Sequence, residues 1–225
     1  MKKLTPLIKK KITKQWHDEF TGLGIYKSMW LLRRVGFFVQ GICLDRDSTN
    51  SNYLPIFHVH NLVGQKDDVI SLTLRTPFRQ ISNGVPFHIT LLQHEKSFSE
   101  YVLDFKAQTP LPLEGGISCD EMIKAYENYI ANGQYETRYP LSQYFDMLCL
   151  FIWCDRIDEA KVFFDDVRDK IDSWPYDVTR YMGERITDFN NLQSYIDNPE
   201  VMRATIETTI ERLGFAGIPS GELIE

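Results

Sequence analysis

The amino-acid sequence predicts an α+β fold, with an antiparallel sheet in the N-terminal half packed with a helical module in the C-terminal half. Short apolar runs rich in Val, Ile, Phe and Tyr fill the first half and are typical of strands. Apolar residues at helical spacing fill the second half. The 225 residues are 43% hydrophobic and 25% charged, so the chain has enough apolar surface for a core and no compositional sign of disorder.

The first segment has the pattern of a basic amphipathic helix. Lysines from Lys2 to Lys14 lie between apolar residues at helical spacing, which are Leu4, Leu7, Ile8, Ile12 and Trp16. We expect the apolar face to pack on the protein's own core while the lysines face solvent, and we assign this helix no partner.

The strands are expected after Gly24, where the periodicity changes. Their predicted positions are residues 35–45, 54–63, 69–76 and 87–92. Residues 45–52 form a loop by composition, and Asn83 with Gly84 is a turn signal. Because such links are short, neighbouring strands should be antiparallel.

Helical periodicity begins at Ser97, which has the spacing of a capping box with Glu100. The stretch 110–116, rich in Pro and Gly, then marks a boundary. It separates a strand-rich module with an N-terminal helix, residues 1–112, from an acidic helical module, residues 113–225. The two could equally be parts of one continuous domain.

The rear module should contain successive amphipathic helices. Ser118 and Glu121 form a capping box that opens the first of them, for which Gly133 is the expected stop. Later helices are expected near residues 140–152, 157–171, 175–196 and 199–213. The second and third should form a hairpin around Asp155, and the tail from Ala216 should be loose.

A cytoplasmic location is expected from two observations. Lysines interrupt the N-terminal segment where a secretory signal would need a continuous apolar run, and apolar runs such as 148–154 are far below the ~18 residues that cross a bilayer. The cysteines also lack a C-x-x-C pair, which favours buried thiols in a reducing compartment; they are Cys43, Cys119, Cys149 and Cys154.

Histidines supply the candidate catalytic residues. Strand alternation places His58 and His60 on the same face, and His88 shares a face of its predicted strand with Thr90. A sheet that brought the three imidazoles together could hold a metal. However, no Asp or Glu lies at a sequence spacing typical of a metal ligand, so we assign no metal and no cofactor.

Residues 86–92, which contain His88 and Thr90, resemble the His-x-Thr strand motif of two-histidine phosphoesterases. The resemblance implies a phosphate cradled by paired strands, with one imidazole acting as base and the other as acid. That chemistry needs two such motifs, and His58-Val-His60 lacks the hydroxyl. The alternative function is therefore a small hydrolase or phosphoesterase that uses these histidines, with or without a metal.

Charge is divided unevenly along the chain, whose net charge is -6. Residues 1–117 hold 15 Lys and Arg against 10 Asp and Glu, a net +5, whereas residues 118–225 hold 10 against 21, a net -11. Fields from like charges on one face add and steer an oppositely charged partner. Phosphate-binding loops, dinucleotide fingerprints, nucleophile elbows and zinc-protease helices are missing from the sequence.

The main functional hypothesis is a non-enzymatic, cytosolic protein-binding protein, such as a bacterial immunity or inhibitor-type protein. Its acidic half would cover a basic protein, and the residues expected to bind are Asp158, Glu159, Asp165 and Asp166. Nucleic acid is not the expected partner, because the first half is only mildly basic and carries no recognised binding motif.

Overall fold

A computed structural model describes residues 3–63, 70, 72–132 and 138–224 of the chain. Strands dominate the N-terminal half and helices the C-terminal half, which confirms the predicted α+β fold class. The chain forms two compact units. Unit 1 comprises Met1–His60, Ile70–Ile117 and Phe215–Glu222, and unit 2 comprises Asn61–Val69, Ser118–Gly214 and Leu223–Glu225.

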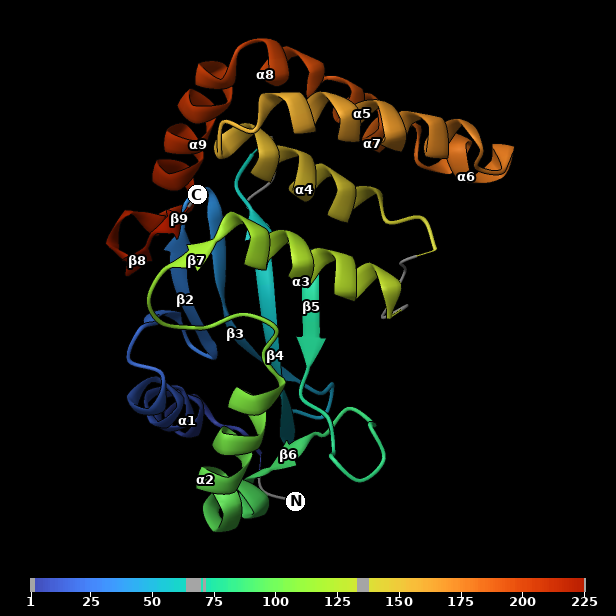
Figure 1. The fold of residues 1–225 in the computed structure, drawn as a ribbon. Helices are drawn as coiled ribbons and strands as arrows, with labels where there is room; N and C mark the ends of the chain where they lie inside the picture. The colour runs from blue at the N-terminus through green and yellow to red at the C-terminus, as the bar shows by residue number, and fades with distance from the viewer. Residues whose placement is uncertain (1–2, 64–69, 71, 133–137, 225) are drawn as a thin grey trace. The chain divides into compact units, whose positions relative to one another are not determined.

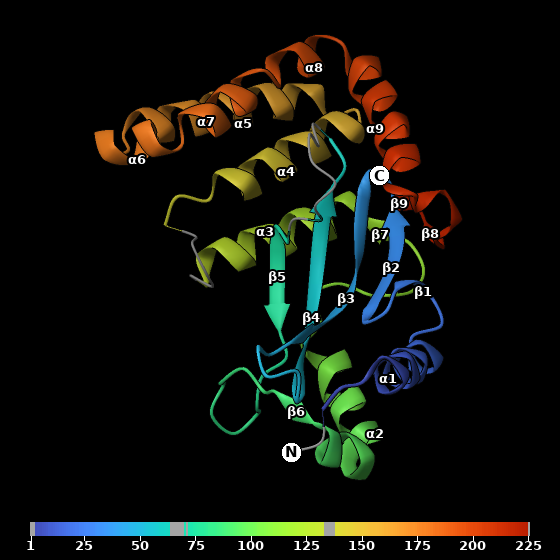
Figure 2. The same ribbon diagram turned by 180° about the vertical axis from the view of Figure 1, so that it is seen from behind.

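The strands of unit 1 form, within the described residues, a seven-stranded sheet (Figures 1 and 2). Its main path runs β1-β2-β3-β4-β5, with β6 paired to β4 and β8 paired to β2. The β1–β2, β2–β3, β4–β5 and β4–β6 pairs are antiparallel, and β2–β8 is parallel. The strands are β1 (Gly24–Lys27), β2 (Trp30–Val35), β3 (Phe38–Arg46), β4 (Asn52–Asn61), β5 (Leu74–Pro77), β6 (Ile89–Thr90) and β8 (Ser220–Gly221).

Two helices of unit 1, α1 (Pro6–Glu19) and α2 (Leu91–Gln108), pack on this sheet around one aromatic cluster. The Trp16 indole N–H donates to the Tyr53 hydroxyl at 3.1 Å, and that hydroxyl lies 2.6 Å from Nδ1 of His94 on α2. The Trp16 ring also meets Phe105 edge-on, at 5.4 Å between centroids. The predicted basic helix is therefore confirmed. Ile12 and Trp16 of its expected apolar face are buried in unit 1, whereas Leu7 is 78% exposed.

The buried guanidinium of Arg33 holds the Pro and Gly stretch against the sheet. Its Nη1 donates to the Gly115 carbonyl at 2.6 Å and its Nη2 to the Pro112 carbonyl at 2.9 Å. Gln40, opposite Arg33 on β3, donates to the same Pro112 carbonyl at 2.6 Å. Gly41 allows the close strand pairing here, since a Cβ there would lie 1.9 Å from the Leu31 carbonyl oxygen.

The predicted strand at 87–92 and the predicted helix start at Ser97 are both wrong. Thr90 caps α2, because its hydroxyl accepts from the Gln93 backbone N–H while the Gln93 side chain accepts from the Thr90 N–H. The helix thus begins at Leu91, and only two residues before it are in a strand. Ser97 has non-helical backbone angles (φ -133°, ψ 23°), so it marks a kink inside α2.

Unit 2 is built from helices, of which α3, α4 and α5 lie one above another in Figure 1. Its helices are α3 (Cys119–Ala131), α4 (Leu141–Trp153), α5 (Ile157–Asp172), α6 (Tyr176–Tyr181), α7 (Gly183–Asn190), α8 (Gln193–Asp197) and α9 (Pro199–Leu213). The expected hairpin of α4 and α5 is present, and it turns at Asp155, whose φ is +54°. The predicted helix over 175–196 is divided into α6, α7 and α8.

The ends of these helices follow local signals. The capping box of Ser118 and Glu121 is formed as predicted, with the Glu121 N–H donating to the Ser118 hydroxyl at 3.2 Å. Gly214 ends α9 in the left-handed conformation that glycine favours (φ +69°). Gly133, the expected stop of α3, lies outside the described residues.

The expected loose tail is wrong, because the residues after the short 3-10 turn η1 (Phe215–Gly217) pair with strands. β1 pairs only with the first half of β2, up to Leu32. β8 pairs with the free end of β2 beyond it, with Arg34 opposite Ser220 and Val35 opposite Gly221. A second, two-stranded sheet joins β7 (Ile117–Ser118) and β9 (Leu223–Ile224).

Two chain-wide features accompany this fold. All four cysteines are free and buried, as their spacing indicated. In the part of the chain that the structure describes, no helix has both the length and the apolar character that a bilayer crossing requires.

Candidate functional site

His58 and His60 lie on β4 and are fully buried. The His58 ring meets the Trp30 ring at an angle, with 5.2 Å between centroids. Neither ring nitrogen of His58 has a hydrogen-bond partner among the described residues. An imidazole enclosed by apolar surface in this way is a core side chain with no visible route for a substrate.

His88 and Thr90 lie far from that pair. β6 joins β4 at its first residues, where Thr90 is opposite Asn52. His58 is six residues further along β4, which corresponds to roughly 20 Å at ~3.3 Å per residue. His88 is exposed, and the Thr90 hydroxyl is engaged in capping α2. Among the residues described, no group of three or more His, Cys, Asp or Glu side chains is arranged to hold a metal ion.

The buried His58 should make stability depend on pH. Burial lowers its pKa in the folded protein to about 3, with a smaller contribution from His60, whereas the unfolded value is near 6.5. As pH falls from about 6.5, the unfolded chain gains a proton that the folded protein does not, so the free energy of unfolding falls by up to ~1.4 kcal/mol per pH unit. We expect His58→Leu to flatten this fall in urea titrations.

His94 provides the internal comparison for that experiment. Burial lowers its pKa to about 4, so its contribution to the acid sensitivity persists in both wild type and His58→Leu. The expected result is a reduced slope of unfolding free energy against pH, with a residual slope left in the variant. Identical slopes in the two proteins would show that His58 is protonated equally in the folded and unfolded states.

The acidic residues expected to bind lie on α5, whose apolar face is buried. Asp158 and Asp165 share one exposed helix face with Asp169, at spacings of seven and four residues. We call these three residues, together with Val162 between them, the acidic face of α5. Val162 is 63% exposed and gives the centre of this face an apolar contact point.

The other two expected binding residues differ from one another. Glu159 is held by Arg156, whose Nε donates to its Oε1 at 2.7 Å while Nη2 donates to Oε2 at 2.6 Å. Arg156 also donates to Asp120 at 2.6 Å, so Glu159 belongs to a structural ion-pair network. Asp166 is exposed beside the acidic face and, in the described part of the chain, forms no ion pair.

A buried carboxylate network in unit 2 escaped the sequence reasoning. Asp146 on α4 is 1% exposed and accepts from the Asn61 side-chain N–H at 2.9 Å and from the Tyr126 hydroxyl at 2.6 Å. Asn61 is fixed in turn, since its Oδ1 accepts from the Val63 N–H at 2.7 Å. The available signal was a single acidic residue within an otherwise apolar stretch of helix.

Comparison of the chain with protein-family models, with curated proteins and with solved structures gave no match. The described surfaces offer two features with clear chemistry: the acidic face of α5 in unit 2, and a basic groove beside α1 in unit 1.

Proposed function

We propose that this chain is a non-enzymatic protein-binding protein that uses the acidic face of α5 to recognise a basic protein. The observation that carries the proposal is the alignment of Asp158, Asp165 and Asp169 on one exposed face of a helix anchored in its unit. Within the described residues, Asp165 and Asp169 form no ion pair, so their charge is available to a partner.

Anchoring matters because a preorganised surface loses less entropy on binding. Ala160, Phe164, Val167 and Ile171 are buried along the opposite face of α5. The Phe164 ring stacks on Phe189 of α7, with 5.4 Å between centroids. The acidic carboxylates therefore project from a fixed backbone, and the net charge of -11 over residues 118–225 adds a long-range field of the same sign.

The arrangement of the histidines favours binding over the alternative of hydrolysis. A general acid or base must come within hydrogen-bond reach of a substrate atom, and His58 is enclosed at 0% exposure. The proposal includes a cytoplasmic role as a bacterial immunity or inhibitor-type protein, because an acidic surface is complementary in charge to a basic toxin or enzyme.

A matched pair of charge reversals tests the proposal. Asp165→Lys/Asp169→Lys alters the acidic face, whereas Glu207→Lys/Glu211→Lys alters an exposed i, i+4 pair on α9 by the same charge. Glu159 is left intact because its reversal would break the Arg156 network. Wild type and both variants serve as bait in a native lysate, and captured proteins are then purified and measured individually.

We expect a basic protein that is retained by wild type and by the α9 variant and is lost by the α5 variant. Circular dichroism should show equal folding of all three baits, since exposed substitutions usually change stability by no more than ~0.5 kcal/mol each. If both variants lost the captured protein equally, net charge alone would explain its binding. If both retained it equally, the acidic face of α5 would be ruled out as the binding surface.

A further inference from the structure

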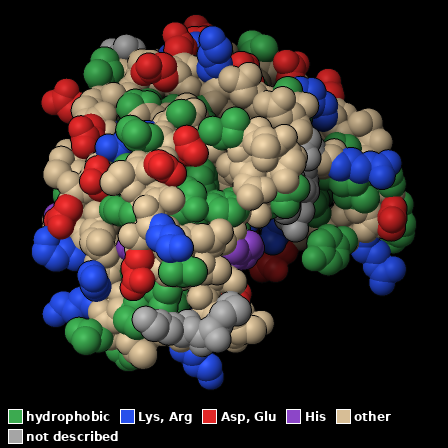
Figure 3. Space-filling view, turned by 90° about the horizontal axis from the view of Figure 1, so that it is seen from below, with side chains coloured by type: hydrophobic (Ala, Val, Ile, Leu, Met, Phe, Trp, Pro, Cys, Tyr) green, Lys and Arg blue, Asp and Glu red, His purple; other side chains and the backbone are tan. Residues whose placement is uncertain are grey.

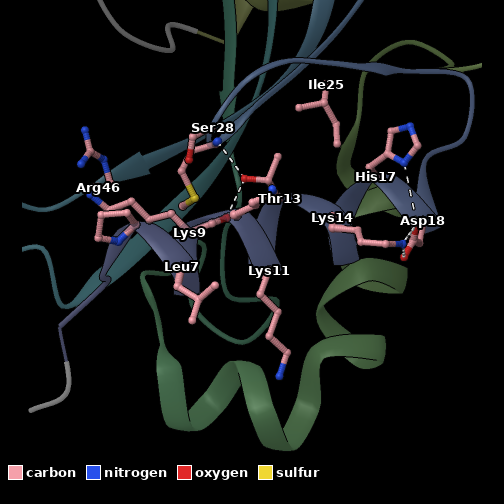
Figure 4. A pocket seen from close by; sticks show the side chains of 13 residues that line it. Leu7, Lys9, Lys11, Thr13, Lys14, His17, Asp18, Ile25, Ser28 and Arg46 are labelled. Carbon is pink, nitrogen blue, oxygen red and sulfur yellow. Dashed lines mark hydrogen bonds and ion pairs between the residues drawn. The ribbon is translucent and has the colours of Figure 1, made fainter.

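A basic groove runs beside α1 in unit 1, with a volume of about 1170 Å³ (Figure 4). Its walls come from α1, from the β1–β2 hairpin and from Arg46 at the end of β3. Figure 3 shows Lys and Arg side chains grouped along the left edge of the face seen from below. The lining includes Lys9, Lys10, Lys11, Lys14 and Arg46, and among the described residues that line it only Asp18 is acidic.

The groove is held open by contacts of α1 that lie behind it. The Thr13 hydroxyl accepts from the Met29 backbone N–H at 2.9 Å and donates to the Lys9 carbonyl at 2.7 Å, which fixes the helix against the turn of the hairpin. Just before the start of α1, the Asn50 side-chain amide donates to the Leu4 carbonyl at 3.2 Å. The groove is therefore a preformed feature of the fold.

The positive charge in the groove is largely uncompensated. Lys14 points toward Asp18 and pairs with it at 2.7 Å (Figure 4). Lys9, Lys10 and Lys11 form no ion pair among the residues that the structure places. This local excess of positive charge is opposite in sign to the net charge of the whole chain, so it gives the groove a field of its own.

Apolar side chains accompany these lysines. Leu7 on α1 is 78% exposed and Ile25 on β1 is 50% exposed, and both line the groove. The apolar stems of the lysines continue this surface. A ligand that satisfies both parts must carry acidic groups next to apolar ones.

We propose that this groove binds an acidic amphipathic helix or peptide segment of a partner protein. Its carboxylates would meet Lys9, Lys10 and Lys11, and its apolar side chains would contact Leu7 and Ile25. Helix-in-groove recognition of this kind combines an apolar contact with a charged rim. The volume exceeds the ~300–1,000 Å³ usual for small-molecule pockets, which favours a segment of polypeptide.

Other anionic ligands fit the groove less well. An interfacial helix inserts its apolar face into lipid, but the apolar face of α1, including Ile12 and Trp16, is already buried in unit 1. Single-stranded nucleic acid stacks its bases on aromatic rings, and no Phe, Tyr or Trp is found among the described residues of the lining. Leu7 and Ile25 would also gain nothing from a phosphate backbone.

Synthetic probes test the proposal directly. A fluorescein-labelled peptide of about 15 residues, with Glu on one helical face and Leu on the other, is compared with a scrambled peptide of identical composition, since shorter helices are marginal in water. Anionic phosphatidylserine vesicles and polyuridylate RNA serve as competing classes of ligand. Anisotropy is measured at several salt concentrations, with sedimentation of the free protein as a check for self-association.

The variants separate charge from apolar contact. Lys10→Glu/Lys11→Glu should weaken binding of the amphipathic peptide by about tenfold or more at low salt and flatten its salt dependence. Lys96→Glu/Lys124→Glu, which makes the same charge change at exposed helical sites elsewhere, should leave the affinity within about twofold. Leu7→Asn/Ile25→Thr should weaken binding at every salt concentration.

Four outcomes would overturn the proposal. Equal affinity for the scrambled peptide would mean charge attraction without amphipathic recognition. Preferential binding of vesicles or of RNA, abolished by Lys10→Glu/Lys11→Glu, would assign the groove to that class instead. Self-association abolished by the same substitutions would assign it to a second copy of the chain. Unchanged peptide affinity in both groove variants would show that the peptide binds elsewhere.

Discussion

Phe164→Ala should lower the free energy of unfolding by ~3–5 kcal/mol, the usual cost of removing a buried aromatic ring. Phe164 is 3% exposed and stacks on Phe189 with an interplanar angle of 15°, so the substitution leaves a cavity between α5 and α7. Chemical denaturation followed by circular dichroism measures the loss. The seam of apolar contacts, including this pair, is what we expect to hold the helices of unit 2 together.

Val162→Ala supplies the control on the same helix. Val162 is on the exposed side of α5, where truncation should change stability by no more than ~0.5 kcal/mol. A large loss from Val162→Ala with little loss from Phe164→Ala would mean that the buried and exposed faces of α5 are interchanged.

Asp146→Ala should be the second severe substitution. It removes the acceptor for both the Asn61 amide and the Tyr126 hydroxyl, and each unsatisfied buried polar group costs ~1–3 kcal/mol. We therefore expect a loss of ~2–6 kcal/mol in unfolding free energy, measured by the same denaturation assay.

Two further variants identify the source of that loss. Tyr126→Phe removes one hydrogen bond and leaves the carboxylate with Asn61, so it should cost less than Asp146→Ala. Asp166→Ala removes an exposed carboxylate and should be nearly neutral. If Asp146→Ala were as mild as Asp166→Ala, the buried network would contribute no net stability.

Local signals account for the parts of the fold that were predicted. Ser118 and Glu121 cap α3 through their own side chains, and Gly214 ends α9 because its backbone adopts positive φ. The same reasoning missed the β1–β2 hairpin, whose turn contains Met29 at φ +72°. Gly, Asn or Asp normally occupies the positive-φ position of such a turn, and with Met29 there the sequence carries no turn signal.

Tertiary pairing accounts for the remaining differences. β8 pairs with the end of β2 that β1 leaves unpaired. Residues 216–224 contain no local signal for this pairing. Thr90 lies in a run of strand-forming residues, so the local pattern predicts a strand where Thr90 in fact caps α2. For β8 the pairing strand is distant in sequence, and for Thr90 the capping signal competes with a strand-like composition.

The candidate surfaces also divide into features set by local sequence and features set by tertiary contacts. Asp158 and Asp165 were expected to bind from charge alone, and the structure places them on one exposed face opposite the apolar stripe of α5. Arg156, which holds Glu159, also donates to Asp120, 36 residues away from it in sequence, and this contact could not be read from local spacing. The groove needs the hairpin beside α1, so the lysines could be noted in the sequence without being assigned a site.

The most direct test of the proposed function is the association rate constant of the captured basic partner, measured by stopped flow across a range of salt concentrations. For wild type the rate should fall steeply as salt rises, because screening shortens the Debye length from ~10 Å at 0.1 M to ~3 Å at 1 M. Asp165→Lys/Asp169→Lys should be slower at low salt and show a shallower dependence, with the two proteins converging at high salt. Equal rates for both proteins at every salt concentration would contradict recognition through the acidic face of α5.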